Sequence, residues 1–488
     1  MKDFIAVSAV LLFIAVSVIP LQAQAQYVTG INPSINGVHS PNSGYGSIPF
    51  EFGRSSLQPN SMLFAKQDST EGDGLQQYGF HGYAAMDEFG TSVSTAGDVN
   101  ADGYDDIIVG APQSDVAFTD GGCAYIFFGG SVVNFDADVI LPGHTASQQF
   151  GLCVSAAGDV NNDGYDDVIV GAPSDQDNSQ RVYIYYGGPA MDNTADVVLS
   201  GQLSLGFSVA SAGDVNDDGY SDVIVGSQIL DQAMIYFGGN PMNNSADLTL
   251  GVINSTFGIS VSSAGDVNSD GYSDIVVGAM NASTGSLTYN GAVYIYYGGP
   301  SLDNVADVSI FGTATNERLG NAVSCAGDVN GDGYSDIVTG AFYYDTYRGK
   351  AYVFYGGASM DVNPDVTFIG EEMGDWLGQS VAGAGDINGD GYDDVLVGAY
   401  HNSEFGQEAG KAYLYYGGTN MNNTADNQFT GTSSNAGFGC SLSSAGDFNN
   451  DGYQDMVIRD NTGNYQISLG DSNGIGNFAA SQATGVAN

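Results

Sequence analysis

The chain of 488 residues carries 9 Lys and Arg against 56 Asp and Glu, a formal net charge of -47. So few cations cannot neutralise a nucleic-acid backbone, and an anionic membrane surface would repel the chain, so both partners are excluded. Disorder is also excluded, because 43% of the residues are hydrophobic, including 30 Tyr and 24 Phe. The 71 Gly residues, against only 12 Pro, are typical of tight turns between many short strands.

The N-terminus is typical of an exported protein. Lys2, the apolar run AVSAVLLFIAVSVI and the small-residue site Ala23-Gln24-Ala25 predict a secretory signal peptide over residues 1–25. A membrane anchor is the alternative, but the apolar run is short for a span and Pro20 ends it. We therefore expect a secreted, extracellular or cell-surface protein, with the periplasm as an alternative. Residues 26–74, rich in Gly, Ser, Asn and Pro, predict a flexible N-terminal segment.

One sequence unit occurs seven times in the next part of the chain. Its core, AGD-(V/I/F)-N-x-D-G-Y-x-D, has its first Asp at 98, 159, 214, 266, 328, 386 and 447. A phrase such as FGTSVST precedes the core, and apolar runs such as DDIIVGAP, CAYIFFGG and ADVILPG follow it. Each unit therefore predicts four short strands rich in Val, Ile, Tyr and Phe and punctuated by Gly.

Four such strands form one antiparallel sheet that cannot bury both of its apolar faces alone. Stacking the sheets radially covers both faces and leaves few exposed edges. The sequence therefore predicts an all-β fold over residues 75–470, a seven-bladed β-propeller of four-stranded antiparallel blades. No helical periodicity competes with this interpretation.

The last unit predicts how the ring closes. After Asp447 it has only two further strand-like runs, DMVIRD and NYQISLG, and residues 471–488 predict a C-terminal tail. A spare strand-like run, QYGFHG, occupies residues 77–82. Its Gly82 lies seven residues before Phe89, just as Gly143 lies seven residues before Phe150. We therefore expect this N-terminal strand to complete the seventh blade.

The repeated loop DVNADGYDD has the pattern of a cation site. Counting its first Asp as position 1, oxygen-bearing side chains stand at positions 1, 3, 5 and 9, and position 7 adds a backbone carbonyl. Such hard oxygen ligands of mixed denticity favour Ca²⁺ over Zn²⁺ or Mg²⁺. Glycine at position 6 allows the positive φ that folds the loop around an ion. We therefore predict about one Ca²⁺ per blade, up to seven.

The seven predicted ligand sets follow the same positions in every copy. The first four are Asp98, Asn100, Asp102, Tyr104 and Asp106; Asp159, Asn161, Asp163, Tyr165 and Asp167; Asp214, Asn216, Asp218, Tyr220 and Asp222; and Asp266, Asn268, Asp270, Tyr272 and Asp274. The last three are Asp328, Asn330, Asp332, Tyr334 and Asp336; Asp386, Asn388, Asp390, Tyr392 and Asp394; and Asp447, Asn449, Asp451, Tyr453 and Asp455.

The residues disfavour two alternatives to calcium loops, an EF-hand and polar turns without metal. An EF-hand requires Glu at position 12 and flanking helices, whereas position 12 here is Val, Thr or Ile and the flanks are strands. Polar turns without metal would crowd three carboxylates into nine residues seven times over, which like-charge repulsion opposes. The loops account for 21 of the 56 acidic residues, and seven Ca²⁺ would bring the charge from -47 to -33. The remaining negative charge makes polyanions the least expected ligands.

The phrase FG…GAP framing DxNxDGxxD resembles the FG-GAP repeat of the integrin alpha propeller. It is also similar to repeats of secreted bacterial proteins, which seven complete loops resemble more closely. The resemblance implies Ca²⁺ in the loop between the first and second strands of a blade, opposite the face that binds ligands. Leu205, Leu319 and Leu377 replace the Phe in three copies, and Arg459-Asp460 replaces Gly-Ala in the seventh. No leg domain or membrane span follows the repeats, so we do not expect an integrin subunit.

Three classes of function remain open from the sequence. We expect no enzyme, because no nucleophile motif such as GxSxG accompanies the four histidines, although a polysaccharide- or phosphoester-acting hydrolase stays an alternative. A calcium-stiffened structural surface or matrix protein is a second alternative. The favoured interpretation is an adhesion or recognition module for a glycan or extracellular protein, and a monomer is compatible with it.

A candidate ligand face follows from the loops that leave the blades on one edge. The loop FYYDTYRG joins the second and third strands of the fifth blade, and EEMGDW joins that blade to the next. Aromatic planes with polar neighbours suit sugars or peptides, although ordinary packing between blades is the alternative. The predicted ligand-binding residues are Tyr343, Tyr344, Tyr347, Arg348, Trp376 and Tyr400.

Overall fold

The computed structural model describes residues 77–81, 87–132, 136–174, 180–201 and 203–472. All of them belong to one compact unit, Pro59–Asn488. The predicted signal peptide, all of the predicted flexible segment and residues 473–488 of the predicted tail lie outside the described residues. Within the described residues, no helix is long and apolar enough to cross a membrane.

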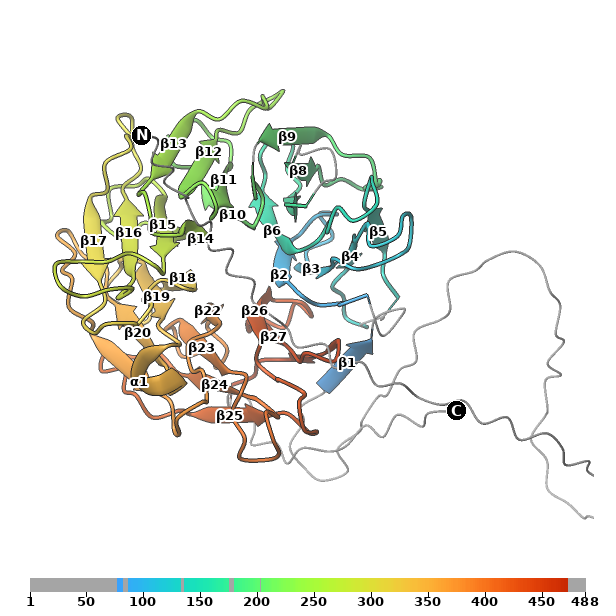
Figure 1. Ribbon diagram of the computed structural model, residues 1–488. Coiled ribbons are helices and arrows are strands. Elements are labelled where there is room, and N and C mark those ends of the chain that lie inside the picture. Colours follow the sequence, from blue (N-terminus) through green and yellow to red (C-terminus); the bar gives the residue numbers. More distant parts are fainter. Residues whose placement is uncertain (1–76, 82–86, 133–135, 175–179, 202, 473–488) are drawn as a thin grey trace, which may run out of the picture. The chain divides into compact units, whose positions relative to one another are not determined.

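The described strands form seven four-stranded antiparallel sheets, so the predicted seven-bladed β-propeller is confirmed (Figure 1). Blades 1 to 3 are β2 (Val93–Gly97), β3 (Asp106–Ala111), β4 (Cys123–Phe127) and β5 (Val139–Pro142); β6 (Cys153–Gly158), β7 (Asp167–Ala172), β8 (Gln180–Tyr185) and β9 (Val197–Gly201); and β10 (Ser208–Gly213), β11 (Asp222–Ser227), β12 (Gln232–Tyr236) and β13 (Leu248–Gly251). Blades 4 and 5 are β14 (Phe257–Gly265), β15 (Asp274–Ala279), β16 (Ala292–Tyr296) and β17 (Val308–Phe311); and β18 (Val323–Gly327), β19 (Asp336–Gly340), β20 (Lys350–Phe354) and β21 (Val366–Ile369). Blades 6 and 7 are β22 (Val381–Gly385), β23 (Asp394–Ala399), β24 (Lys411–Tyr415) and β25 (Asn427–Thr430); and β26 (Ser441–Gly446), β27 (Asp455–Arg459), β28 (Asn464–Ser468) and β1 (Gln77–His81).

The hydrophobic core is divided among the interfaces between neighbouring blades. Every residue of β3 is buried, because successive side chains point to opposite faces and a blade covers each face. Ile108 packs with Val168 of blade 2, whereas its neighbour Val109 packs with Val457 of blade 7. Seven such clusters, one at each interface, account for the buried apolar side chains. Each fully buried Val or Ile contributes about 1.5–3 kcal/mol to this packing.

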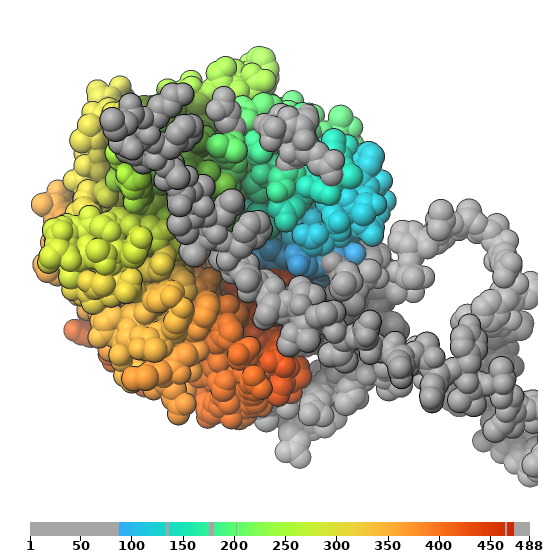
Figure 2. Space-filling view, viewed as in Figure 1, coloured from blue at the N-terminus to red at the C-terminus, as the bar shows by residue number. Residues whose placement is uncertain are grey.

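The first strand of each blade lies at the centre of the ring. These strands contact one another in chain order, and β26 of blade 7 contacts β2 of blade 1 (Figure 1). The colours of the space-filling view follow the same order around the face (Figure 2). Small side chains suit this crowded centre, and some of them join the first strands of neighbouring blades. Val154 N donates to Ser92 Oγ at 3.0 Å, and Val323 N donates to Ser260 Oγ at 3.1 Å.

Blade 7 is assembled from both ends of the described chain. β1 pairs antiparallel with β28, from Gln77 opposite Ser468 to His81 opposite Asn464. The sheet order is β1-β28-β27-β26. This arrangement joins the ends of the ring without a covalent bond.

The strand pairing of β1 generates a prediction about stability. A chain that begins at residue 82 should unfold more easily than one that begins at residue 77, because β28 then becomes an unpaired edge. At about 1 kcal/mol for each lost backbone hydrogen bond, we expect a loss of about 2–5 kcal/mol in the free energy of unfolding. Urea unfolding of the two chains measures the difference; equal stabilities would show that β1 does not hold the ring together.

Candidate functional site

The loops that join the first and second strands of the blades have the same backbone conformation in all seven copies. Glycine at position 6 has a positive φ, from 88° to 94°, in every loop. The residue at position 4 also has a positive φ, for example 56° at Ala101 and 53° at Asn450. The backbone therefore turns twice within four residues, which brings the side chains at positions 1, 3 and 5 into one short arc.

The aspartate at position 1 organises each loop by accepting two backbone hydrogen bonds. Asp98 Oδ1 accepts from Asp102 N at 3.0 Å, and its Oδ2 accepts from Gly103 N at 2.8 Å. The other six loops repeat both bonds. Asp102 Oδ1 in turn accepts from Tyr104 N at 3.1 Å. Carboxylate oxygens have further lone pairs, so these bonds leave room for a cation.

The aspartate at position 9 is fully buried and has a structural role that the sequence analysis missed. Asp106 Oδ2 accepts from Val99 N of its own loop at 3.0 Å, and Oδ1 accepts from Gly129 N beyond the third strand at 2.8 Å. All seven copies make the equivalent pair of bonds. The Gly-Gly after the third strand of blades 1 to 6, and Gly470 in blade 7, were the available signal, because the first glycine supplies the second amide.

Burial makes the charge on these carboxyls costly. Desolvation raises the pKa of Asp106, Asp394 and Asp455 to about 8, and that of Asp167, Asp222, Asp274 and Asp336 to about 7. The carboxyls at positions 1 and 5 of the same loop raise these pKa values further. A divalent cation in the loop would offset both effects.

The donor set of the loops fits a hard cation. Each loop offers three carboxylates, one amide oxygen and one backbone carbonyl, all of them oxygen ligands. In blade 2 the Oδ1 atom of Asn161 at position 3 is buried and has no hydrogen-bond donor, as expected of an oxygen that faces an ion. In the other six loops the equivalent oxygen accepts a hydrogen bond from the N–H at position 5. Among the described residues, no three His, Cys, Asp or Glu side chains form a ready metal cluster, so calcium binding stays a prediction.

Each loop also contacts the loop of the preceding blade. The backbone N–H at position 8 donates to the carbonyl at position 1 of that loop, with Asp105 N to Asp447 O at 3.3 Å closing the ring. The other six interfaces repeat this bond. Where position 8 is Asp, its side chain accepts from the same neighbour, as Asp166 Oδ2 does from Asp98 N at 3.0 Å. The candidate metal loops therefore form one continuous hydrogen-bonded ring.

A second set of aspartates missed from the sequence precedes each fourth strand. Asp138 Oδ2 accepts from Phe128 N at 2.9 Å across the third turn of blade 1. Blades 2 to 6 repeat the bond with Asp196, Asp247, Asp307, Asp365 and Asp426. These carboxylates account for part of the acidic excess without any metal.

The structure brings four of the predicted ligand-face residues into one aromatic cluster. Tyr347 stacks on Trp376 with ring centroids 4.9 Å apart and planes at 15°. The ring centroids of Tyr343 and Tyr347 lie 4.0 Å apart, and those of Tyr400 and Trp376, which meet edge-on, lie 5.5 Å apart. His401, which the sequence analysis did not select, lies 4.5 Å from Trp376. All five side chains are partly exposed.

Backbone geometry explains why these side chains meet. Trp376 directly precedes the Leu of its FG-type motif and has a positive φ of 60°. Its N–H donates to Tyr347 O at 2.8 Å, which fixes the connection between blades 5 and 6 against the loop of blade 5. That loop contains α1 (Tyr344–Tyr347), a single turn whose Asp345 and Thr346 have positive φ and which is not a regular helix.

The two remaining predicted residues lie beside the aromatic cluster with other partners. The Lys350 ammonium lies over the Tyr344 ring, 3.6 Å from its centroid. Arg348 Nε is 3.5 Å from Asp345 Oδ2. Neither Tyr344 nor Arg348 has a described ring contact with Trp376, so the structure divides the six predicted residues into a cluster of four and two flanking side chains.

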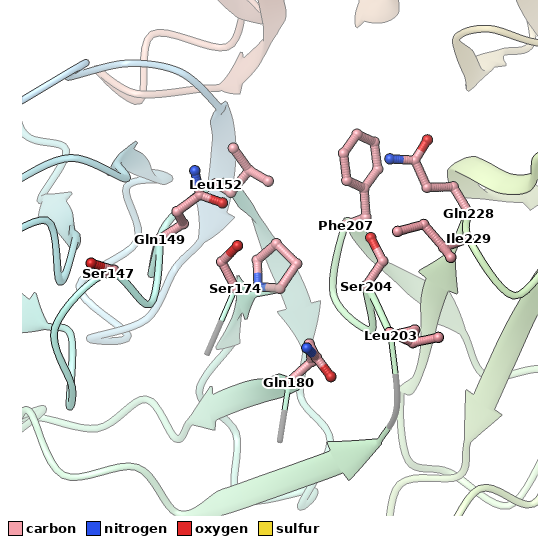
Figure 3. Close-up of a pocket in the computed structure, with 11 residues that line it drawn as sticks. Ser147, Gln149, Leu152, Ser174, Gln180, Leu203, Ser204, Phe207, Gln228 and Ile229 are labelled. Atoms are coloured by element: carbon pink, nitrogen blue, oxygen red, sulfur yellow. The ribbon is translucent and has the colours of Figure 1, made fainter. Parts of the chain in front are cut away.

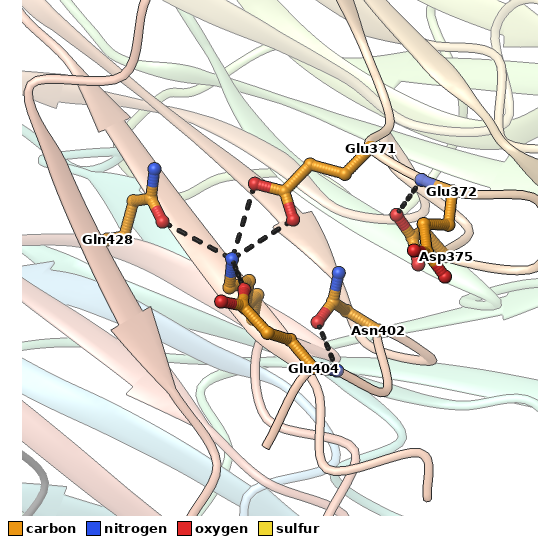
Figure 4. A network of polar contacts seen from close by, with 7 residues as sticks. Glu371, Glu372, Asp375, Asn402, Glu404 and Gln428 are labelled. Atoms are coloured by element: carbon orange, nitrogen blue, oxygen red, sulfur yellow. Dashed lines mark hydrogen bonds and ion pairs between the residues drawn. The ribbon is translucent and has the colours of Figure 1, made fainter. Parts of the chain in front are cut away.

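Two concavities lie on this edge of the blades, and one of them adjoins the loops of blades 5 and 6. One of about 540 Å³ surrounds the buried Lys411, whose ammonium contacts Glu371 at 3.1 Å, Gln428 at 3.2 Å and Glu404 (Figure 4). The other, of about 460 Å³, lies between blades 2 and 3, with Leu152 and Phe207 on opposite sides (Figure 3). None of the described residues that line the second cavity is charged.

Comparison with known proteins agrees with the repeat and the fold. A family model described as the FG-GAP repeat matches residues 89–127, 154–185, 257–296, 320–354 and 377–415, which lie in blades 1, 2, 4, 5 and 6. Integrin alpha-5 of Xenopus laevis is 30% identical over 268 residues, covering 49% of this chain and 24% of that protein. Integrin alpha-6 of Gallus gallus is 36% identical over 173 residues, covering 34% of this chain and 16% of that protein.

The fold defines a seven-bladed β-propeller, and the matches identify repeats within it. Five FG-GAP repeats are found in the chain, and parts of it are similar to integrin alpha chains, as the resemblance of its motifs predicts. It covers about a quarter or less of the length of these curated relatives. A crystal structure of BBS1N in complex with ARL6DN, soaked with mercury, overlaps 79% of this chain and 93% of that chain with a TM-score of 0.49 and 10% identity, which is too low for a functional comparison.

The different roles of positions 5 and 9 generate a prediction in blade 5. Asp336→Asn should lower stability by about 1–3 kcal/mol even in EGTA, because its amide NH₂ would face a backbone N–H that needs an acceptor. Asp332→Asn keeps an oxygen for Tyr334 N and should leave the stability in EGTA unchanged, while reducing the stabilisation by Ca²⁺. Thermal unfolding with and without Ca²⁺ separates the two roles. Equal effects of both substitutions in EGTA would contradict the assignment.

Proposed function

We propose that this chain is a secreted, calcium-binding recognition module that uses the edge of its blades opposite the metal loops to bind a glycan or an extracellular protein. The observation that carries the proposal is the separation of two kinds of surface on one ring. One edge repeats the same oxygen-rich loop seven times. The other edge carries unique side chains, including the only Trp of the chain.

Topology supports this division. In a four-stranded antiparallel blade, the loops between strands 1 and 2 and between strands 3 and 4 lie on one edge, and the remaining connections lie on the other. Repeated residues serve what every blade needs, whereas a recognition site requires residues that differ between blades. The partly exposed aromatic cluster of blades 5 and 6 meets that requirement. The similarity of the chain to integrin alpha chains supports recognition over catalysis.

Calcium binding should stabilise the folded ring. A cation that binds the folded loops and not the unfolded chain contributes about 2.7 kcal/mol per site at a free concentration 100 times its Kd. We therefore expect EGTA to lower the melting temperature and added Ca²⁺ to restore it, with up to seven ions bound. Calorimetry and native mass spectrometry measure both quantities; a melting temperature indifferent to EGTA would rule out the calcium sites.

The aromatic cluster should be required for ligand binding. On a panel of glycans and matrix proteins, the double variant Trp376→Ala, Tyr347→Ala should bind at least about 30-fold more weakly, as expected for removal of an aromatic contact worth about 2 kcal/mol. The matched control is Phe118→Ala, Phe311→Ala, which removes two exposed rings elsewhere. Unchanged binding by the aromatic-cluster variant would dismiss the site, and a wild-type protein that binds nothing would favour the structural alternative.

A further inference from the structure

The cations of this acidic protein share one location. Six of its nine Lys and Arg residues are described, and each lies in a connection or at a strand end on the edge opposite the metal loops: Arg181, Arg318, Arg348, Lys350, Lys411 and Arg459. Four of these six belong to blades 5 and 6 or to the connection between blades 4 and 5. Positive charge is therefore concentrated beside the aromatic cluster, in a chain whose formal net charge is -47.

Arg318 differs from Lys411 and Arg348 because no described carboxylate pairs with it, a feature that it shares with Lys350, whose ammonium lies over the Tyr344 ring. Lys411 is enclosed by Glu371 and Glu404, and Arg348 lies near Asp345. The only described hydrogen bond of the Arg318 side chain runs from Nη1 to Asn281 Oδ1. Its Nε is buried and has no acceptor. An unpaired guanidinium in so acidic a protein calls for an anionic partner, because buried donors are normally satisfied.

The surroundings of Arg318 hold its guanidinium in place. The Tyr289 ring centroid lies 5.4 Å from Cζ, and the Tyr343 ring centroid lies 4.9 Å from it. Arg318 N donates to Tyr289 O at 3.2 Å, the counterpart of the bond between Trp376 and Tyr347. Arg318 and Trp376 therefore occupy equivalent positions in successive blade connections, each with a positive φ of about 60°. A guanidinium fixed in this way loses little entropy when it binds an anion.

Tyr343 connects the guanidinium to the aromatic platform. It contacts Arg318 on one side and Tyr347 on the other, and Tyr347 stacks on Trp376. A ligand that lies against the Tyr347 and Trp376 rings would thus have a cation within reach along the same surface. Tyr347 and Trp376 cover each other where they stack, so a sugar would lie against the partly exposed remainder of the two rings, and the planar guanidinium suits a carboxylate.

We propose that the aromatic cluster binds a carbohydrate that carries a carboxylate, with the sugar ring on Trp376 and Tyr347 and the carboxylate on Arg318. This inference rests on the proposed recognition function and names its ligand class. The acidic groups around Lys411 flank the other side of Trp376, and the formal net charge repels extended anions. The site therefore selects a single carboxylate, whose attraction to Arg318 acts within the screening length of about 8 Å at physiological salt.

The test compares two oligosaccharides that differ only at the carboxyl group. One ends in glucuronate, and in the other that carboxyl is reduced to an alcohol. The calcium-loaded full chain should bind the glucuronate form about tenfold or more tightly, as a charge-assisted hydrogen bond predicts. Arg318→Gln should abolish this preference while keeping the weaker binding of the reduced form, and Arg318→Lys should restore part of it.

The controls separate this inference from the function on which it rests. Arg181→Gln, which removes a cation from the same edge of blade 2, should leave the preference intact, and melting temperatures verify that each variant is folded. Equal binding of the two oligosaccharides by the wild-type chain, or equal loss of both in Arg318→Gln, overturns the inference. Binding of neutral glycans that is lost in Trp376→Ala would then still uphold the recognition function, whereas binding only to acidic peptides would overturn the carbohydrate assignment.

Discussion

The carboxylate of Asp106, like its equivalents in the other six blades, ties together two backbone amides from separate parts of its blade. One amide lies in the loop that follows the first strand, and the other lies beyond the third strand. Each blade thus depends at one edge on a single desolvated carboxyl group, whose raised pKa records the cost of its burial. The oxygen-rich loop above it holds two further carboxylates and is bonded to the next loop around the ring. Blade closure, the packing of neighbouring blades and the proposed cation sites therefore share one group of atoms.

The two edges of the ring differ in what they allow to vary. Residues of the metal-loop edge are constrained by bonds that recur in every blade, so the loops differ little from one another. On the opposite edge the recurring side-chain bonds are made by different residue types, as at Gln148, Glu317 and Asp375. Its loops range from the compact turn of blade 3 to the aromatic turn α1 of blade 5. In such a fold the strands hold the ends of these loops, but the loop sequences are free to differ between blades. Binding surfaces on rigid folds are usually found on loops of this kind.

Much of this architecture could be predicted because the same pattern is read seven times. Strand order, blade number and the positive φ of Gly103 and its equivalents follow from periodicity and turn chemistry, and the structure agrees with them. The second bond of Asp106 could not be predicted with equal ease, since its donor, Gly129, is distant in sequence and is brought near only by the sheet. Trp376 was found because a lone Trp is conspicuous, whereas Arg318 was missed. Its significance lies in a buried Nε without a described acceptor and in its contact with Tyr343, which only a folded chain reveals.

The hydrogen bonds between successive candidate metal loops have a consequence for how the molecule unfolds. In a linear array of repeats, the end units fray first and each unit contributes its own increment of stability. Here the last loop is bonded to the first, from Asp105 to Asp447, and no unit is terminal. Opening any one interface exposes the apolar faces of two blades to water at once. No smaller closed ring can form that would bury these faces again. Unfolding is therefore a collective event, and a weakness in one blade is shared by all seven.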